Sequence, residues 1–354
     1  MTESHYLAQG LLAAVRAQGF GSTPDNDHGG APVAHFPSID LAVAAFGPNG
    51  TARWANVLFS REHPHGLVAQ IGDKATAVQG IRFDADQQDP RGDSVVWAKA
   101  TDWQRLKLAP LHGSGPLRVV APYPASLLKL MVAVGVAMAV DRGLTRWPAA
   151  LEPMIVVSDN DATDTCVALL HRLKLVGALN QRFADLGLHT LQLNDTTARG
   201  GWRNGDGSGV GHIHMTAWDT VRLLWLLDAD APPPPWLPAG TQLLQPATRA
   251  HLRGVLARQQ LDEILSSGSL RGVPGWVAGL PDAPAFAHKT GTTDNYASDA
   301  GIVRLSSATN VGTHFIVAVL TSLGSRYAPH VRCATTWRLP SLGAAVHQLV
   351  KTLT

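Results

Sequence analysis

The chain has 354 residues, 45% of them hydrophobic and 16% charged, which is typical of a globular protein and excludes a disordered one. The net charge is only +2 and the 29 basic residues are dispersed, so no Lys/Arg run marks a nucleic-acid or anionic-membrane surface. This length exceeds what one small core needs and predicts one large domain or two intergrown ones.

The first twenty residues predict an amphipathic helix. Apolar residues recur at helical spacing between Leu7 and Val15, and Glu3 and Arg16 flank them, unlike the basic and apolar regions of a signal peptide. The longest apolar run of the chain is too short for a membrane span. We therefore expect a cytoplasmic protein, or a periplasmic or secreted one if a leader precedes this sequence.

Residues 39–59 predict two strands around the turn Pro48-Asn49-Gly50. Further strands are predicted at 66–72 and 93–100. Residues 126–143 are apolar all round apart from Lys129, which indicates a buried helix.

The second half of the chain alternates helical and strand patterns. A helix is predicted from Asp161, a glycine-rich loop at 198–214 and another helix at 215–229. Strands at 286–293, 299–305 and 313–323 then precede a closing helix at 342–353. Strands at both ends with helices between them predict an α+β fold with a helical subdomain.

Ser126 and Lys129 form the first candidate catalytic pair, because positions i and i+3 of a helix share one face. Pro122 and Pro124 keep the approach extended and place Ser126 at the helix start, where unpaired N–H groups favour an oxyanion. Desolvation lowers the pKa of a lysine among apolar residues, and a neutral amine can take the proton of a serine nucleophile. Alternatively, Ser126 is a helix N-cap and Lys129 extends to water.

Ser158-Asp159-Asn160 is the second candidate motif, with a hydroxyl and a carboxamide on one tight turn. Such residues also suit an ordinary turn before a helix, with Asn160 or Asp161 as the N-cap.

Lys289-Thr290-Gly291 is the third candidate motif, at the end of a predicted strand. Lys289 and Thr290 can bind a carboxylate, and Gly291 lets a ligand's backbone approach closely. The alternative is a plain strand end with an exposed lysine.

In this order, Ser-x-x-Lys, Ser-Asp-Asn and Lys-Thr-Gly are the motif set of serine β-lactamases and penicillin-binding proteins. The chain therefore resembles the penicillin-recognising serine hydrolases, and among them class A β-lactamases most. The resemblance covers about residues 120–350, with the strands near 40–58 matching the family's first strands. It implies a β-lactamase/transpeptidase-like fold, whose antiparallel sheet combines N- and C-terminal segments and is flanked by helices.

The resemblance assigns the chemistry to three side chains. Ser126 is the implied nucleophile, Lys129 its base, and Ser158 the group that passes a proton to the leaving nitrogen. The reaction is acyl transfer through an acyl-enzyme.

The resemblance also assigns substrate-binding residues. Asn160 would hydrogen-bond a substrate amide and orient Lys129, while Lys289 and Thr290, in the Lys-Thr-Gly motif with Gly291, would bind the substrate carboxylate. The backbone N–H groups of Ser126 and Thr292 would form the oxyanion hole.

The domain organisation departs from the class A pattern. The stretch from Ser126 to Ser158 is short, so the helical subdomain is expected to be reduced. Residues 59–120 form an atypical insertion that we expect to cover part of the cleft. We divide the chain into 1–120, with the first helix, first strands and insertion, and a catalytic region 121–354, intergrown with the strands of 38–60.

The water-activating residue of class A enzymes is missing. These enzymes use the Glu of an E-x-x-L-N stretch, but residues 186–202 hold no glutamate. Asp195 is the nearest carboxylate and a possible deacylation base, although a turn role suits it as well. Ser126 can still be acylated, but a penicilloyl-enzyme should hydrolyse slowly, as in penicillin-binding proteins. For less inert acyl groups, Lys129 can itself activate water.

Other features indicate structural roles. His212 and His214 have no third ligand nearby, so we expect no metal, and nothing implies a cofactor. Cys166 and Cys333 are expected to be buried thiols, and His288 structural. Arg91-Gly92-Asp93 fits a polar loop. Four tryptophans are assigned to the core or a cleft wall: Trp54, Trp97, Trp103 and Trp202.

The sequence thus predicts a class A-like serine hydrolase that cleaves an amide, β-lactam or ester with a nearby carboxylate, in a small or peptide-like substrate. The alternatives are a penicillin-binding protein or DD-peptidase, a cytoplasmic esterase, and a non-catalytic penicillin-binding sensor or interaction module. The intact Ser126/Lys129 pair argues against a non-catalytic protein. The oligomeric state stays open.

Overall fold

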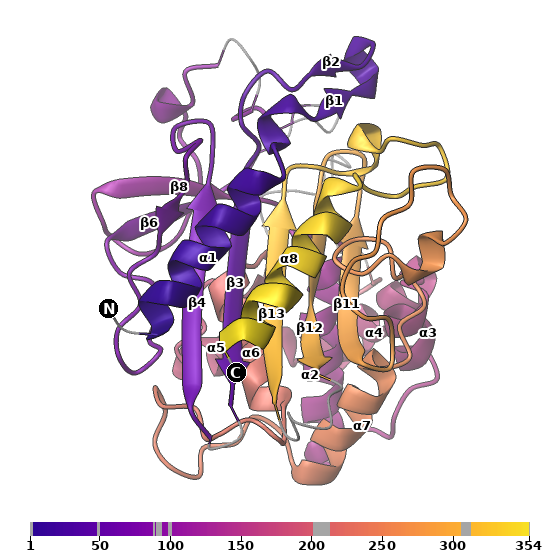
Figure 1. Cartoon of the computed structure of the whole chain (residues 1–354). Coiled ribbons are helices and arrows are strands. Elements are labelled where there is room, and N and C mark those ends of the chain that lie inside the picture. Colours follow the sequence, from indigo (N-terminus) through magenta and orange to yellow (C-terminus); the bar gives the residue numbers. More distant parts are fainter. Residues whose placement is uncertain are drawn as a thin grey trace.

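The computed structural model describes residues 3–47, 50–87, 89, 94–97, 101–200, 213–305 and 313–353. At its centre lies an antiparallel six-stranded sheet, in the order β11-β12-β13-β3-β4-β5 (Figure 1). The N-terminal part supplies β3 (Ile39–Phe46), β4 (Ala52–Phe59) and β5 (Leu67–Val68). The C-terminal part supplies β11 (Phe286–Thr292), β12 (Ala297–Arg304) and β13 (His314–Thr321). The predicted α+β fold with a sheet from both ends of the chain is confirmed.

The two central strands are mostly apolar, as expected for strands covered on both faces, and Asp40 is the one charged exception in β3. Every residue of β3 and β13 is buried, and the two strands pair with Ala42 opposite Ala318. Small side chains on this face let the buried helix α6 (Ala217–Leu227) pack directly against β3, β12 and β13.

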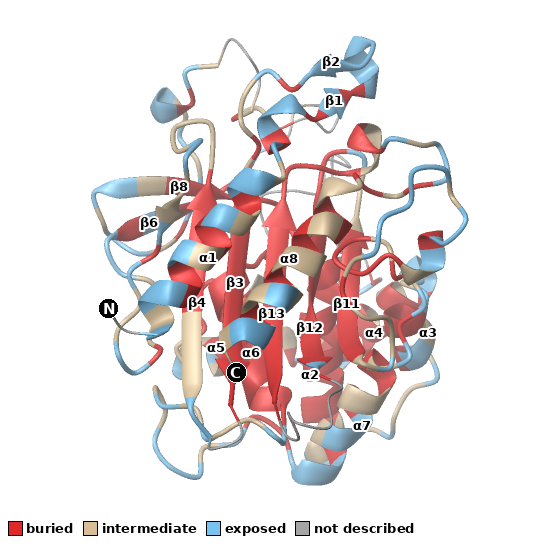
Figure 2. Cartoon of the chain, viewed as in Figure 1, coloured by how far each residue is buried: buried red, intermediate tan, exposed pale blue. Residues whose placement is uncertain are grey.

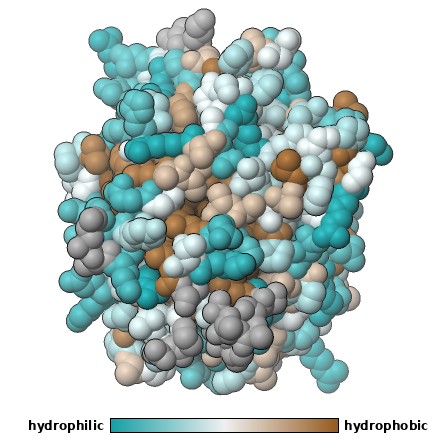
Figure 3. Space-filling view, viewed as in Figure 1, coloured by the Kyte–Doolittle hydropathy of each residue, from teal (hydrophilic) through white to brown (hydrophobic). Residues whose placement is uncertain are grey.

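Helices cover both faces of the sheet. On one face α1 (Glu3–Ala17) packs against α8 (Arg338–Leu353), and Figure 2 shows these two helices buried only on the side toward the strands. Figure 3 shows hydrophilic and hydrophobic residues mixed across this face. Behind the sheet lie α6 and the remaining helices, namely α2 (Lys129–Asp141), α3 (Leu151–Val156), α4 (Asn160–Arg172), α5 (Val176–Asp185) and α7 (Pro246–Leu256).

The predicted buried helix begins later than expected. All residues from Lys129 to Ala139 are buried, as the apolar sequence predicts, but α2 starts at Lys129. Ser126 lies before it, in a short 3-10 helix spanning Ala125–Leu128. Ser126 is therefore not the N-cap of α2, because that position is held by Leu128, which makes no capping hydrogen bond.

The insertion forms a small sheet of its own. The strands β6 (Ile81–Ala85), β7 (Pro110–His112) and β8 (Leu117–Ala121) lie in the order β7-β6-β8. Residues 95–97 of the strand predicted at 93–100 form a turn, because the Ser94 hydroxyl accepts the Trp97 N–H and donates to Asp86. The strand predicted at 66–72 is reduced to the two residues of β5.

The last short strands are β1 (Pro24–Asp25), β2 (Ala31–Pro32), β9 (Gln192–Leu193) and β10 (Ile213–His214). Cys166 and Cys333 are buried free thiols, as predicted. Trp103 is buried, and Trp54 and Trp97 pack against core residues. Some sequence predictions fall outside the described residues: Pro48, Asn49, Arg91-Gly92-Asp93, Trp202 and His212.

No helix in the described ranges is both long and apolar enough to cross a membrane. Within the same ranges, no group of three or more His, Cys, Asp or Glu side chains is arranged to hold a metal ion.

Candidate active site

The Ser158 hydroxyl is the meeting point of two buried lysines. Lys129 Nζ donates to Ser158 Oγ at 3.1 Å, and Lys289 Nζ donates to the same oxygen at 3.0 Å. Both lysine side chains are fully buried, so the alternatives of an extended Lys129 and an exposed Lys289 are wrong. One residue from each of the three sequence motifs therefore lies in a single hydrogen-bond network.

The turn at Ser158 is built to hold Lys129. Ser158 has a φ of 56°, a left-handed conformation that is unfavourable for a residue other than glycine. Lys129 Nζ donates to the Ser158 carbonyl at 2.6 Å and to Asn160 Oδ1 at 2.8 Å. Asp159, and not Asn160 or Asp161, is the N-cap of α4, since its side chain accepts the Ala162 N–H at 2.7 Å.

The backbone before Ser126 is also strained. Ala125 has a φ of 50°, so the residues before Ser126 and at Ser158 both adopt a conformation that costs about 1–3 kcal/mol. Strain of this kind concentrates at functional sites, where the surrounding fold enforces it. Tyr123 steadies the approach, because its ring packs edge-on against Tyr296 at 5.9 Å.

Gly291 brings the strand of the third motif against the Ser126 turn. A Cβ at Gly291 would lie 2.6 Å from both the Leu127 nitrogen and the Pro124 oxygen. The space beside Gly291 is thus filled by the protein's own backbone. The sequence analysis had instead assigned this space to the backbone of a ligand. Ser298 reinforces the contact by donating its hydroxyl to the Pro124 carbonyl.

Two threonines of β11 have unsatisfied hydroxyl groups. The Oγ1 atoms of Thr290 and Thr292 are buried, and neither has a hydrogen-bond partner within the described ranges. A buried hydroxyl without a partner costs free energy, so such atoms are suited to meet a polar ligand. β11 is the edge strand of the sheet, so no other strand of the described residues pairs with its outer side.

The two lysines affect each other's protonation. Burial and the charge of Lys129 lower the pKa of Lys289 well below its usual value, against the opposing charges of Asp299 and Glu263. Each lysine Nζ lies about 3 Å from Ser158 Oγ, so the two nitrogens are at most about 6 Å apart. At an effective dielectric constant of about 20, two unit charges this close repel by at least roughly 3 kcal/mol. The pair is therefore expected to carry one positive charge more readily than two.

The segment around the expected water-activating residue contains no acid at the matching position. Counting back from Leu193 and Asn194 in the E-x-x-L-N pattern gives Thr190, a residue that the sequence analysis did not single out. Thr190 is buried and donates its N–H to Asp219 at 2.9 Å, while Asp219 also pairs with Arg222.

Asp195 lies exposed in the bend after β9. Its φ of 48° is a turn conformation that Asp tolerates better than most residues. Its role in deacylation stays a prediction.

The insertion contacts two segments of the catalytic region that was defined from the sequence. The Tyr296 hydroxyl, just after β11, donates to Asp86 at 2.9 Å, and Asp86 lies directly after β6. His112 of β7 stacks on His189 with ring centroids 4.5 Å apart. The insertion is thus tied to the hairpin that follows Lys-Thr-Gly and to the segment that includes Thr190.

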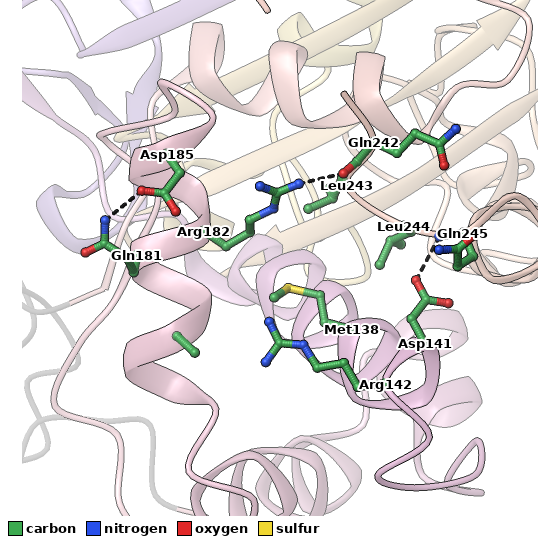
Figure 4. Close-up of a pocket in the computed structure, with 11 residues that line it drawn as sticks. Met138, Asp141, Arg142, Gln181, Arg182, Asp185, Gln242, Leu243, Leu244 and Gln245 are labelled. Carbon is green, nitrogen blue, oxygen red and sulfur yellow. Dashed lines mark hydrogen bonds between the residues drawn. The ribbon is translucent and has the colours of Figure 1, made fainter. Parts of the chain in front are cut away.

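A pocket of about 540 Å³ lies elsewhere, between the end of α2, α5 and residues 242–245 (Figure 4). In Figure 4, Asp141 faces Gln245 and Arg182 faces Gln242, so these charged groups are already partnered by the chain. Lys129 and Asp141 are opposite ends of α2, about 18 Å apart at 1.5 Å per residue. This pocket is therefore separate from the lysine network.

The sequence matches the model of one known protein family. A sequence model described as the beta-lactamase enzyme family matches residues 145–335, which include the second and third motifs but not Ser126 and Lys129. No curated protein matches the chain.

Several solved structures are similar to this chain. PBP-A is 21% identical with a TM-score of 0.42, over 64% of this chain and 79% of its own. A beta-lactamase from Streptosporangium roseum is 17% identical with a TM-score of 0.42, over 65% and 85%. A mutant of the class D beta-lactamase BAT-2 is 8% identical with a TM-score of 0.30, over 89% and 90%.

Proposed function

The chain belongs to the beta-lactamase enzyme family, and from this premise we propose that it is an active-site-serine hydrolase that forms an acyl-enzyme on Ser126. One observation carries the proposal. Lys129 and Lys289, from the first and third motifs, both hydrogen-bond to Ser158 of the second. Each of the three motifs is common by chance, but unrelated motifs are not expected to contact the same buried oxygen. Their convergence on Ser158 therefore supports a joint catalytic role.

In the proposed acylation step, the Ser126 oxygen attacks a carbonyl carbon while neutral Lys129 takes the serine proton. The carbonyl oxygen becomes an oxyanion, held by the backbone N–H groups of Ser126 and Thr292. As the intermediate collapses, the bond to the leaving nitrogen breaks and Ser158 gives that nitrogen a proton. Ser158 regains its proton from Lys129, which restores the neutral amine.

The substrate would be a small or peptide-like amide, β-lactam or ester with a nearby carboxylate. Lys289 and Thr290 would bind that carboxylate, which would also give the buried Thr290 hydroxyl the partner it lacks in the described chain. Asn160 would hydrogen-bond the substrate amide while its Oδ1 keeps Lys129 in place. Residues 121–354 would carry this chemistry, and the insertion would line one side of the cleft.

The absence of the class A glutamate, which activates water for deacylation, favours a penicillin-binding protein over an efficient β-lactamase. Thr190 stands where a class A enzyme has its glutamate, and the nearby Asp219 carboxylate is held by Arg222 and Thr190 itself. We therefore propose that acylation by a penicillin outpaces hydrolysis. For esters and less inert acyl groups, Lys129 would activate the water.

Incubation with a fluorescent penicillin and, separately, with a p-nitrophenyl ester tests the proposal, with intact mass followed over time. We expect a lasting adduct on Ser126. Rapid nitrocefin turnover would instead indicate a β-lactamase, and ester turnover without penicillin labelling an esterase. An adduct without turnover of any ester or peptide would favour the sensor. No adduct and no turnover, with Ser126→Ala indistinguishable from the unmodified protein, would refute the catalytic proposal.

A further inference from the structure

A buried histidine behind the Lys-Thr-Gly motif is held between two carboxylates. His288 Nδ1 lies 2.7 Å from Asp299 Oδ1, and His288 Nε2 lies 3.0 Å from Asp262 Oδ1. All three residues are buried. Since each ring nitrogen faces a carboxylate, both nitrogens carry a proton and the ring is positively charged. We call these residues the acid–histidine–acid chain.

The acid–histidine–acid chain has more negative than positive charge, and it lies across the sheet from the Lys289 side chain, because His288 stacks on Phe286 and successive residues of a strand point to opposite faces. His288 precedes Lys289 in β11, and Asp299 of β12 is the cross-strand partner of Thr290, the residue after it. One imidazolium cannot balance two carboxylates, and Glu263 directly follows Asp262. The charges of Asp299 and Glu263 both favour the protonated form of Lys289, which Lys129 and burial oppose.

We propose that the acid–histidine–acid chain and Glu263 are the counter-charge of the lysine pair, and that they keep the proton on Lys289 so that Lys129 becomes the neutral base. This proposal rests on the proposed function, because it states which lysine does which task. A protonated Lys289 can bind the substrate carboxylate, and a neutral Lys129 can accept the Ser126 proton. Asp299 and Glu263 are thus positioning residues, which act through Lys289 without touching the substrate.

Lysine titration measures this bias directly. The chain has few lysines, so the ¹³Cε signals of the full-length protein can be assigned with the variants Lys129→Met and Lys289→Met. We expect Lys289 to titrate at higher pH than Lys129 in the unmodified protein. We expect Glu263→Gln and Asp299→Asn each to lower the Lys289 midpoint by at least about half a pH unit, as the loss of a nearby opposite charge does.

Two variants separate this effect from misfolding. Glu263 is only partly buried, so its isosteric replacement by Gln should keep the fold even where Asp299→Asn does not. Glu3→Gln is the matched control, because Glu3 pairs with Arg53 at the surface and should leave both lysine midpoints unchanged. A Lys289 midpoint below that of Lys129, or one that neither variant moves, would overturn the proposal.

The rate of labelling by fluorescent penicillin against pH gives an independent readout. If Lys289 must be charged to bind the carboxylate, the fall in labelling at alkaline pH should begin at lower pH in Glu263→Gln than in the unmodified protein. Unaltered alkaline behaviour in this variant would contradict the proposal. Absence of labelling altogether would refute the proposed function, while the lysine titration would still decide the order of the two midpoints.

Discussion

Gly291 and Leu127 approach so closely that a methyl group on the glycine would lie 2.6 Å from the leucine nitrogen. A Cβ atom does not tolerate a non-bonded contact this short with backbone atoms, so Gly291→Ala must push the Ser126 turn away from β11. A displacement of about 1 Å can cost 10²-fold in rate. We expect penicillin labelling to slow by about that factor, and the measurement is the second-order labelling rate constant.

A matched control for this change is Gly177→Ala. Gly177 lies in α5, where nothing stands within 4 Å of the added Cβ. There the substitution should be neutral or stabilise the protein by up to about 1 kcal/mol, because alanine favours helix more than glycine. Normal labelling by Gly291→Ala would show that the contact does not position Ser126.

Ser158→Ala tests the shared acceptor of Lys129 and Lys289. The change removes the oxygen that both lysine Nζ atoms contact and the proposed proton donor to the leaving nitrogen. General acid–base catalysis contributes about 10²–10⁴-fold, and we expect acylation by penicillin to fall within this range. Ser22→Ala, at an exposed serine, is the control and should label normally. A decrease of less than threefold in Ser158→Ala would exclude the proposed role of Ser158.

Tyr296→Phe tests the link between the insertion and the hairpin after β11. Burial raises the pKa of Asp86 to about 6, despite the hydrogen bonds from Ser94 and Tyr296. At pH 7.5 the carboxylate is ionised and would lose one of its donors, which costs about 1–3 kcal/mol. The free energy of urea unfolding measures this loss. Tyr6→Phe, at a tyrosine that is 57% exposed, should change it by less than about 0.5 kcal/mol. An equally small effect of both substitutions would mean that the Tyr296 hydroxyl contributes no more to stability than that of an exposed tyrosine.

Helices and strands with a clear hydrophobic pattern could be predicted from the sequence. Strand β13 is a run of apolar residues and α2 an apolar helix, and both were predicted near their observed positions. The small sheet of the insertion was missed, because its β6 and β8 pair in parallel across a long intervening segment. The 3-10 start before α2 was also missed, since the apolar residues around Ser126 carry no period that distinguishes the two helix types.

The candidate site was predictable as a list of residues but not as a network. Order and spacing of the motifs singled out Lys129, Ser158 and Lys289, yet only the fold brings two lysines to one oxygen. His288 was taken as structural, since a lone histidine beside a motif carries no signal of its partners. Asp262 reaches it from a segment 26 positions earlier in the chain, and no sequence period reports such a contact.

The stability of the protein should depend on pH through His288. Although burial alone would lower it, Asp299 and Asp262 raise the pKa of His288 from 6.5 to about 9. A group whose pKa is higher in the folded than in the unfolded protein stabilises the fold fully at pH values below its unfolded-state pKa. This stabilisation is lost as the pH rises through the folded-state pKa. We therefore expect His288 to contribute roughly 3 kcal/mol at pH 6 that declines between about pH 6.5 and 9.

Lys289 acts in the opposite direction over part of this range, because its lowered pKa makes the folded protein more stable as pH rises toward 10.5. The contribution of His288 is therefore measured as a difference, by comparing urea unfolding of the unmodified protein and His288→Gln from pH 6 to 9. The gap between the two should shrink with pH. A gap that is constant across the range would show that His288 does not hold its extra proton in the folded state.

The lifetime of the acyl-enzyme should be long and independent of Asp195. The class A glutamate has no counterpart at Thr190, whose hydroxyl is bonded within the fold to Asp219 at 2.7 Å. Asp195 is exposed and has the φ of a turn residue, which favours a role in the bend over one in activating water. After excess penicillin is removed, the mass of the adduct should therefore decay equally slowly in the unmodified protein and in Asp195→Asn. A several-fold longer lifetime in Asp195→Asn, with an unchanged acylation rate, would instead assign Asp195 as the base that activates the deacylating water.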